Sequence, residues 1–281
     1  MSLSQRRKSE PVSASSGSGM VEFVSQRRAG LGALAVILVA ILGVGWLWKN
    51  HGDTVGWSGD SLLEPARIEL EGVAPWVQAD VKAEALKAAS LDRGLPLTDP
   101  ELANRLARAF DTHPWVKQVV DVRLSHPAAA VVEVVCREPA AMVVVKGGLL
   151  AVDAESVVLP SDDFTAEAAA EYPRLTGIES SPQGPEGARW GDPVVEEAAM
   201  VASVIGPDWK PLGLVECRPV VQAGTRRWEL IGPESQAINF GSAPGHEREG
   251  EPSAAVKAAA LRKLVGQPLP ASADLTQPPG L

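Results

Sequence analysis

A run of twenty residues without a charged side chain, residues 29–48, constrains this chain more than any other feature. A helix rises about 1.5 Å per residue, so the run would form a helix about 30 Å long, the thickness of the hydrocarbon core of a bilayer. The sequence therefore predicts a single transmembrane helix over residues 29–48, with most of the chain beyond the membrane.

The charges beside this run predict its orientation. Residues 1–28 carry five basic and two acidic side chains, a net charge of +3, and basic residues stay on the cytoplasmic side. We therefore expect a cytoplasmic amino terminus, a disordered tail over residues 1–28 and an extracytoplasmic remainder. The alternative is a cleaved secretory signal, but Trp46, Trp48 and Lys49 stand where small residues would mark a cleavage site, which favours a retained anchor.

Composition excludes some functions of the outer part. The whole chain carries −9 and the tail +3, which leaves −12 beyond the tail and argues against nucleic acid as a partner. No CxxC motif or Cys/His cluster is present, so neither a metal nor a cofactor is expected. Cys136 and Cys217 form either one disulfide or two unpaired thiols, and their spacing does not decide between these alternatives.

After a polar linker (residues 49–65), residues 66–137 show the periodicities of strand, helix, helix, strand and strand. We expect strands at 67–73, 118–124 and 130–137, one helix at 74–90, and another that begins at Thr98 or Asp99. The simplest packing is a three-stranded sheet with both helices on one face, which is the arrangement of a POTRA module.

Residues 138–281 predict a mixed, mainly antiparallel β domain with flanking helices. We expect short strands at 143–145, 149–152 and 157–159, helices at 193–205 and 252–265, and a hairpin of 226–231 with 236–240. The expected fold class is thus α+β: one transmembrane helix, a β-α-α-β-β POTRA domain and the β-rich domain.

Several short motifs stand in an order that is typical of one protein family. They are Gly72-Val73, Leu95 to Asp99, Pro114-Trp115-Val116, Arg123 to Pro127, Arg137 to Ala141, Val152-Asp153, Tyr172 to Gly177 and Trp228 to Leu230. In this order the chain resembles the bacterial cell-division family FtsQ, called DivIB in Gram-positive species. The POTRA motif residues that the resemblance identifies are Gly72, Pro114, Trp115, Val116, Arg137 and Pro139.

The chain also departs from that family. Cys136 stands where Glu is usual, Ser156 stands where Gly usually forms a turn, and residues 278–281 end the chain where relatives often continue into a further strand. Trp115 itself has two interpretations, a core anchor or an exposed partner contact.

The resemblance implies a non-enzymatic, single-pass scaffold of the division septum that links early and late division proteins at the cytoplasmic membrane. Its implied partners are FtsB-like and FtsL-like single-pass proteins, besides other septal proteins and the lipid bilayer, with no small-molecule substrate. We expect binding by strand addition at the last sheet edge. The candidate contact residues are Trp228, Leu230, Ile238, Phe240, Leu269 and Leu275.

Two other functions compete with this hypothesis. A POTRA-bearing component of protein export or envelope assembly would bind extended substrates along the first sheet edge. An esterase is suggested only by the four residues Gly59 to Leu62, which place Ser61 in the expected linker without an Asp-x-x-His partner motif. We therefore expect no enzymatic activity.

Overall fold

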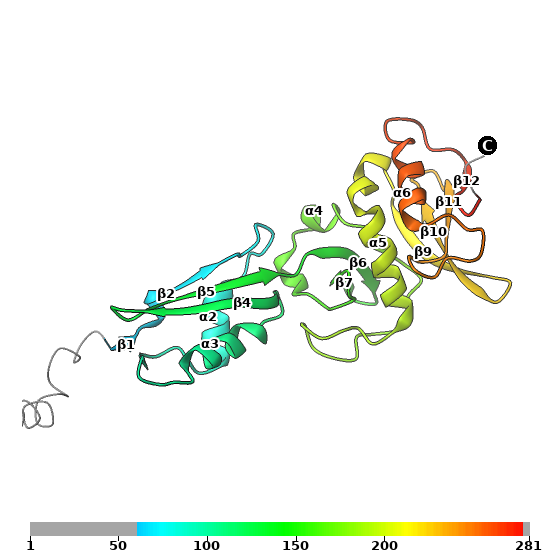
Figure 1. The fold of residues 1–281 in the computed structure, drawn as a ribbon. Helices are drawn as coiled ribbons and strands as arrows, with labels where there is room; N and C mark the ends of the chain where they lie inside the picture. The colour runs from blue at the N-terminus through cyan, green and yellow to red at the C-terminus, as the bar shows by residue number, and fades with distance from the viewer. Residues whose placement is uncertain (1–60, 278–281) are drawn as a thin grey trace, which may run out of the picture. The chain divides into compact units, whose positions relative to one another are not determined.

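The computed structural model describes residues 61–277 and shows an α+β fold with two main sheets (Figure 1). A three-stranded sheet has the order β2-β5-β4, and a seven-stranded sheet has the order β12-β11-β10-β9-β8-β6-β7. The short strands β1 (Leu62–Leu63) and β3 (Leu95–Pro96) pair with each other.

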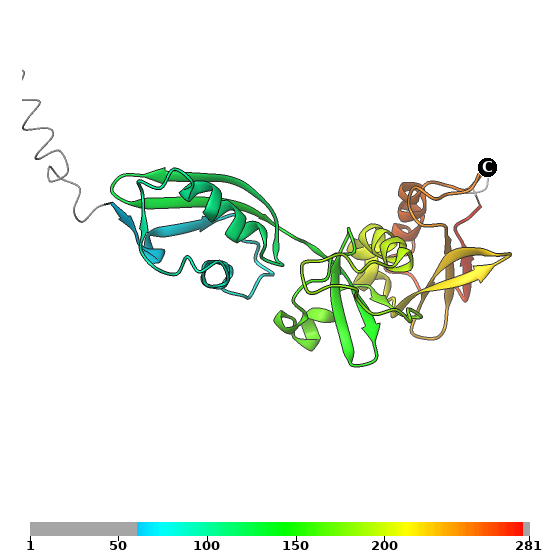
Figure 2. The same ribbon diagram turned by 90° about the horizontal axis from the view of Figure 1, so that it is seen from below.

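The first module consists of the three-stranded sheet and two helices on one of its faces (Figures 1 and 2). Its elements are η1 (Pro65–Arg67), β2 (Ile68–Glu71), α2 (Val81–Ala88), α3 (Leu102–Asp111), β4 (Val116–Ser125) and β5 (Ala129–Cys136). Strand β5 lies in the middle, parallel to β2 and antiparallel to β4. Its alternate side chains Ala130, Val132 and Val134 are buried toward the helices, as a half-covered sheet requires.

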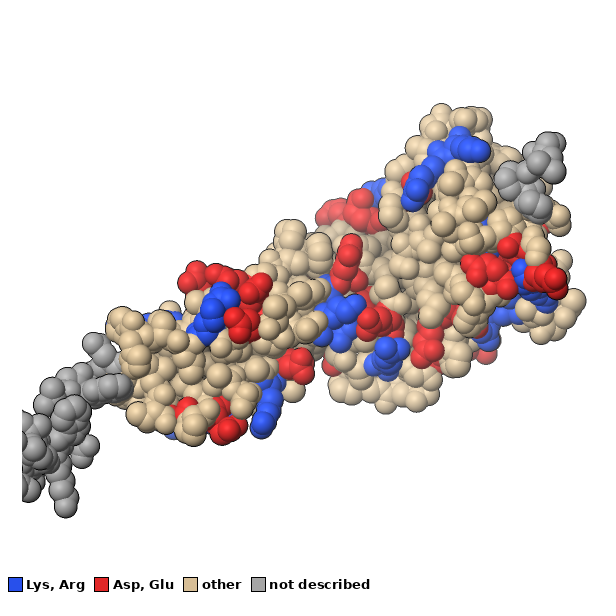
Figure 3. All heavy atoms as spheres, viewed as in Figure 1, with Lys and Arg blue, Asp and Glu red and all other residues tan. Residues whose placement is uncertain are grey.

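The opposite face of this sheet is polar. Arg123 of β4 contacts Glu71, Asp121 and Glu133, at 3.1, 3.0 and 3.4 Å, and so joins all three strands. Charges of both signs lie side by side over this sheet in Figure 3. All four side chains are about half exposed, so these pairs keep the face soluble more than they stabilise the fold.

The second module contains the seven-stranded sheet. Its elements are β6 (Pro139–Val145), β7 (Gly148–Asp153), η2 (Ser161–Asp163), α4 (Ala166–Ala169), β8 (Arg174–Leu175), α5 (Pro193–Leu212), β9 (Glu216–Gln222), β10 (Thr225–Ile231), β11 (Ala237–Gly241), α6 (Ala254–Arg262) and β12 (Ser272–Asp274). Asp192 caps α5 by accepting a hydrogen bond from the Val194 N–H at 2.8 Å, and Gly213 ends it in the left-handed conformation. The buried side of α5 packs against the sheet.

Strand β6 contributes to two hydrophobic cores. Ala141 and Val143 belong to the core of the second module, whereas Met142 points into the core that also contains the helices of the first module. Ala151 of β7, Leu159 and Ala169 extend this first core in the same way. The two modules therefore meet through packed apolar side chains.

Several expectations need correction. The expected fold began with a membrane-spanning helix, but no helix within residues 61–277 combines the length and the apolar character that crossing a bilayer requires. Residues 29–48, on which that expectation rested, lie outside the described residues. The second sheet is mixed, because the pairings β11/β12, β6/β8 and β8/β9, three of its six, are parallel, while most of its paired residues lie in the antiparallel pairings, as expected.

The expected helix over residues 74–90 is shorter than its periodicity suggested. It begins at Val81, because Asp80 accepts a hydrogen bond from the Ala83 N–H at 3.0 Å and caps the helix there. The preceding segment is held by Trp76, whose Nε1–H donates to the Arg137 carbonyl at 2.9 Å. Val157 and Val158 form isolated bridges in place of the strand expected at 157–159, whereas β8, β9 and β12 were not expected.

Candidate functional site: the open sheet edges

The described residues hold no cluster of three or more His, Cys, Asp or Glu side chains that could bind a metal ion. Cys136 and Cys217 are both buried and free, which decides between the two alternatives for the thiols. Burial raises the pKa of the Cys217 thiol far above its usual value, so this group stays protonated and unreactive. The unpaired edges of the two main sheets are the next candidate sites.

Two of the four edges of the main sheets are protected. Strand β4 is long, but two register shifts and the charged side chains of Lys117, Asp121 and Arg123 interrupt it, features that discourage pairing with another chain. Strand β7 is covered by the segment that follows it, since the Leu159 N–H donates to the Ala151 carbonyl at 2.9 Å.

Strand β12 is the open edge of the seven-stranded sheet. It pairs in parallel with β11, and the Leu275 N–H donates to the Asn239 carbonyl at 2.9 Å while the Ala237 N–H donates to the Ala271 carbonyl at 3.2 Å. Because backbone groups alternate in direction along a strand, Ser272 and Asp274 direct their N–H and C=O groups away from β11. Both residues are exposed.

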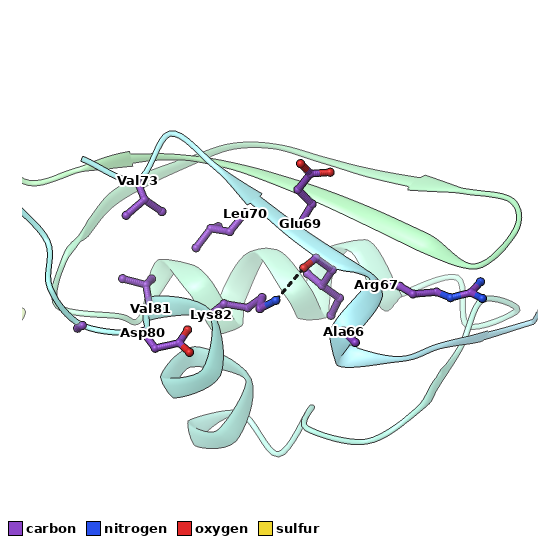
Figure 4. A pocket seen from close by; sticks show the side chains of 10 residues that line it. Ala66, Arg67, Glu69, Leu70, Val73, Asp80, Val81 and Lys82 are labelled. Carbon is purple, nitrogen blue, oxygen red and sulfur yellow. Dashed lines mark hydrogen bonds between the residues drawn. The ribbon is translucent and has the colours of Figure 1, made fainter. Parts of the chain in front are cut away.

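Strand β2 is the open edge of the three-stranded sheet, and it lies beside a groove of 560 Å³ (Figure 4). Residues 66–70 and Val73 form one wall, and residues 79–82 at the start of α2 form the other. Lys82 reaches across the groove and its Nζ donates to the Ile68 carbonyl at 3.3 Å, so one edge carbonyl is already occupied. Leu70, Val73 and Val81 supply apolar surface between the charges of the rim.

The expected partner contacts fall into two groups. Trp228, Leu230, Ile238 and Phe240 are fully buried beneath the helices of the second module, so their side chains cannot meet a partner. Leu269 and Leu275 are half-buried beside β12 and pack against the same core. The sheet edge that sequence reasoning pointed to is therefore available through the backbone of β12, not through the side chains of β10 and β11.

The POTRA motif residues lie in the first module and in its connection to the second. Gly72 has φ +86°, and a Cβ there would lie 2.0 Å from the Val134 carbonyl oxygen, so only glycine fits. Arg137 pairs with Asp153 at 2.7 Å, and Val116, which pairs with Cys136 of β5, and Pro139 are both buried. Pro114 packs against Gly187, where an added Cβ would lie 3.3 Å from the Pro114 Cα.

Trp115 is a core anchor and not a surface contact. Its side chain has no exposed area, its Nε1–H donates to Asp163 Oδ2 at 2.6 Å, and its ring centroid lies 5.9 Å from that of Phe164. The Trp115 N–H donates to His113 Nδ1, which leaves the Nε2–H of His113 to donate to Glu84.

A buried ion pair fixes the connection between β11 and α6, close to the β12 edge. Lys257 Nζ is fully buried, donates to Glu251 Oε1 at 2.5 Å and lies 4.8 Å from the centre of the Phe240 ring. Burial alone would raise the pKa of Glu251, but the hydrogen bonds from Lys257, Ser242 and Arg248 outweigh it and lower the pKa to about 2. Sequence reasoning missed this pair because a lysine is rarely buried, although Lys257 lies four residues before Leu261 on the buried face of α6.

Sequence reasoning also missed Lys82 and the groove beside β2. The signal that could have found them is the polar start of α2 after Asp80, since a lysine in the first turn of a short helix is poorly placed for the helix dipole. No model of a known protein family matches this chain, and no curated protein is significantly similar to it.

Proposed function

We propose that this protein is a non-enzymatic scaffold of the cell-division septum, similar to the FtsQ/DivIB family. It would act at the outer face of the cytoplasmic membrane and bind FtsB-like and FtsL-like single-pass proteins together with other septal proteins. The ordered motifs from Gly72 to Leu230 support the family, and the open β12 edge supports the mode of binding.

The exposed edge of β12 is the observation that carries the proposal. An extended segment of the partner would add to the sheet through the outward backbone groups of Ser272 and Asp274. The buried pair of Lys257 and Glu251 would keep the neighbouring β11–α6 connection rigid while the partner binds.

Ser272→Pro tests this mode of binding directly. The substitution removes the outward N–H at position 272 but leaves the hydrogen bonds of Ala271 and Leu275 to β11 in place. We expect full-length Ser272→Pro protein to lose co-purification with FtsB-like and FtsL-like proteins from solubilised membranes, whereas Ser272→Ala retains it. Equal capture by both variants, with unchanged thermal unfolding, would exclude strand addition at β12.

Localisation tests the function itself. A fluorescently tagged protein should gather at the septum, and its depletion should produce undivided filaments. An even distribution around the cell together with normal division on depletion would rule out the scaffold.

The groove beside β2 favours a second candidate function, a component of protein export or envelope assembly. An extended substrate would lie between β2 and α2 after displacing Lys82 from the Ile68 carbonyl. Lys82→Ala should then increase capture of unfolded substrate proteins without changing septal localisation, and unchanged capture would count against this candidate.

A further inference from the structure

The second module carries a hollow of 340 Å³ that neither open edge uses. It is bounded by the first residues of β6, by the residues before β8, and by the part of α5 that contains Gly206 and Pro207. Six of the eleven residues that line it are alanine or proline, and these form an apolar floor beside the polar side chains.

The lining of this hollow is short of hydrogen-bond donors. Pro139, Pro173 and Pro207 have no N–H groups, and Pro207 lies within α5, where it cannot donate to the Ser203 carbonyl one turn earlier. The Ser203 hydroxyl already donates to the Met200 carbonyl at 2.8 Å. The three prolines thus remove three backbone donors from the lining, and the Pro173 carbonyl is already occupied by the Met142 N–H at 2.9 Å, which leaves the side chains of the rim as the main polar groups.

The acceptors are concentrated at the rim. Glu138, Glu171 and Tyr172 all line the hollow. Burial raises the pKa of Tyr172, and the negative charges of Glu138 and Glu171 raise it further, which places both carboxylates within electrostatic reach of the phenol. Lys210 pairs with Glu171, but both side chains are more than half exposed, so this surface pair is easily exchanged.

We propose that this hollow binds one basic side chain, an arginine by preference, presented by a partner polypeptide. A guanidinium carries donors only, which complements the carboxylates of Glu138 and Glu171 at the rim. Its aliphatic stem would pack on the alanine and proline floor, and its planar head would meet Glu138 beside the Tyr172 ring. The negative rim repels phosphate and lipid headgroups, so the partner is a basic protein segment. This inference goes beyond the proposed function and does not depend on it.

Two peptides that differ in one side chain test the proposal. Full-length protein is titrated into fluorescein-labelled Gly-Ser-Arg-Ser-Gly, and in parallel into the same peptide with neutral citrulline in place of arginine, with fluorescence anisotropy as the readout at low ionic strength. We expect the arginine peptide to bind about tenfold more tightly than the citrulline peptide.

Three variants locate the effect. Glu138→Gln should weaken binding of the arginine peptide about fivefold, and Lys210→Met, which frees Glu171, should tighten it about threefold. Glu234→Gln removes an exposed carboxylate at the β10–β11 turn and should leave binding unchanged. The opposite signs of the first two variants separate a site effect from unfolding, which could only weaken binding.

Equal binding of the two peptides, or Glu138→Gln and Glu234→Gln acting alike, would overturn the proposal. Neither result would bear on the scaffold, because septal localisation and capture through β12 are measured separately.

Discussion

The two modules hold one strand of each sheet, β2 in the first and β11 in the second, with different chemistry. In the first module the chain leaves β2 through Gly72, which lies against the backbone of β5 so closely that no side chain could be added. In the second module the chain leaves β11 and enters α6 around a buried lysine and a buried glutamate. The first module thus depends on shape and the second on charge. We therefore expect acid and the loss of a charged side chain to destabilise the second module, and an added side chain at Gly72 to destabilise the first.

Lys257→Met should have the largest effect. It leaves Glu251 buried at 4 % exposure without its cation, and breaking such a pair costs about 3 to 5 kcal/mol of the free energy of unfolding. Chemical denaturation measures the total loss. Hydrogen exchange should rise in β11 and α6 and stay unchanged in β2 and β5. The double variant Lys257→Met/Glu251→Met should recover most of the stability, and a double variant as unstable as the single one would show that packing, not charge, matters here.

Gly72→Ala tests the other half of the comparison. An alanine there combines a positive φ with a Cβ against the Val134 carbonyl, and we expect a loss of about 3 kcal/mol in the free energy of unfolding. Gly245→Ala is the matched control, since Gly245 has φ +79° with open space around its Cα and should lose only about 1 kcal/mol. Equal losses in the two variants would mean that the close approach in the first module is unimportant.

Lowering the pH should destabilise the second module through Glu251. Glu251 has a pKa lowered to about 2 from an ordinary value of 4.5, so its contribution is complete above about pH 4.5 and disappears as the pH falls toward 2. The contribution at neutral pH is of the order of 3 kcal/mol. Because other carboxylates also titrate in this range, the decisive quantity is the difference in stability between the wild type and Lys257→Met. That difference should shrink as the pH falls, and a constant difference from pH 7 to 2.5 would contradict the assignment.

The smallest expected effect is an increase in stability. Ser156 has φ +60°, is fully buried, and its hydroxyl has no hydrogen-bond partner among the described residues. Ser156→Gly removes both the backbone strain and the unpaired hydroxyl, so the melting temperature should rise, with a gain of about 1 kcal/mol. Ser235→Gly relieves a similar φ at an exposed turn and should gain less. A loss of stability in Ser156→Gly would show that the second module does not store strain at this turn.

The sequence predicted those parts of the fold whose signals are local. The apolar alternation along β5 was sufficient, and the hairpin of β10 and β11 is confirmed. The helix expected at 193–205 begins at Pro193 as predicted, but it continues to Leu212 through Pro207 and Pro211. Strands β8 and β12 were missed because two or three residues cannot show a period. The individual parallel pairings were not predicted because they depend on partners far apart in the chain, such as Met142 with Arg174.

The candidate sites were less predictable. Sequence reasoning found the region around β12, but it assigned the contact to Trp228 and Phe240 since large aromatic residues are common both in cores and at interfaces. Burial alone distinguishes these roles, and burial depends on α5 and α6, which cover the sheet. The hollow at Pro207 requires three distant segments to meet, which no local pattern reveals.

The shared position of β6 has a practical consequence for making fragments of this protein. A cut after residue 137 would seem natural from the sequence, yet it would remove Met142, Ala151 and Leu159 from the core of the first module. The shortened piece would expose apolar surface that the intact chain covers, and it would tend to self-associate. Fragments intended for binding studies should therefore retain both modules, with deletions confined to the ends of the chain.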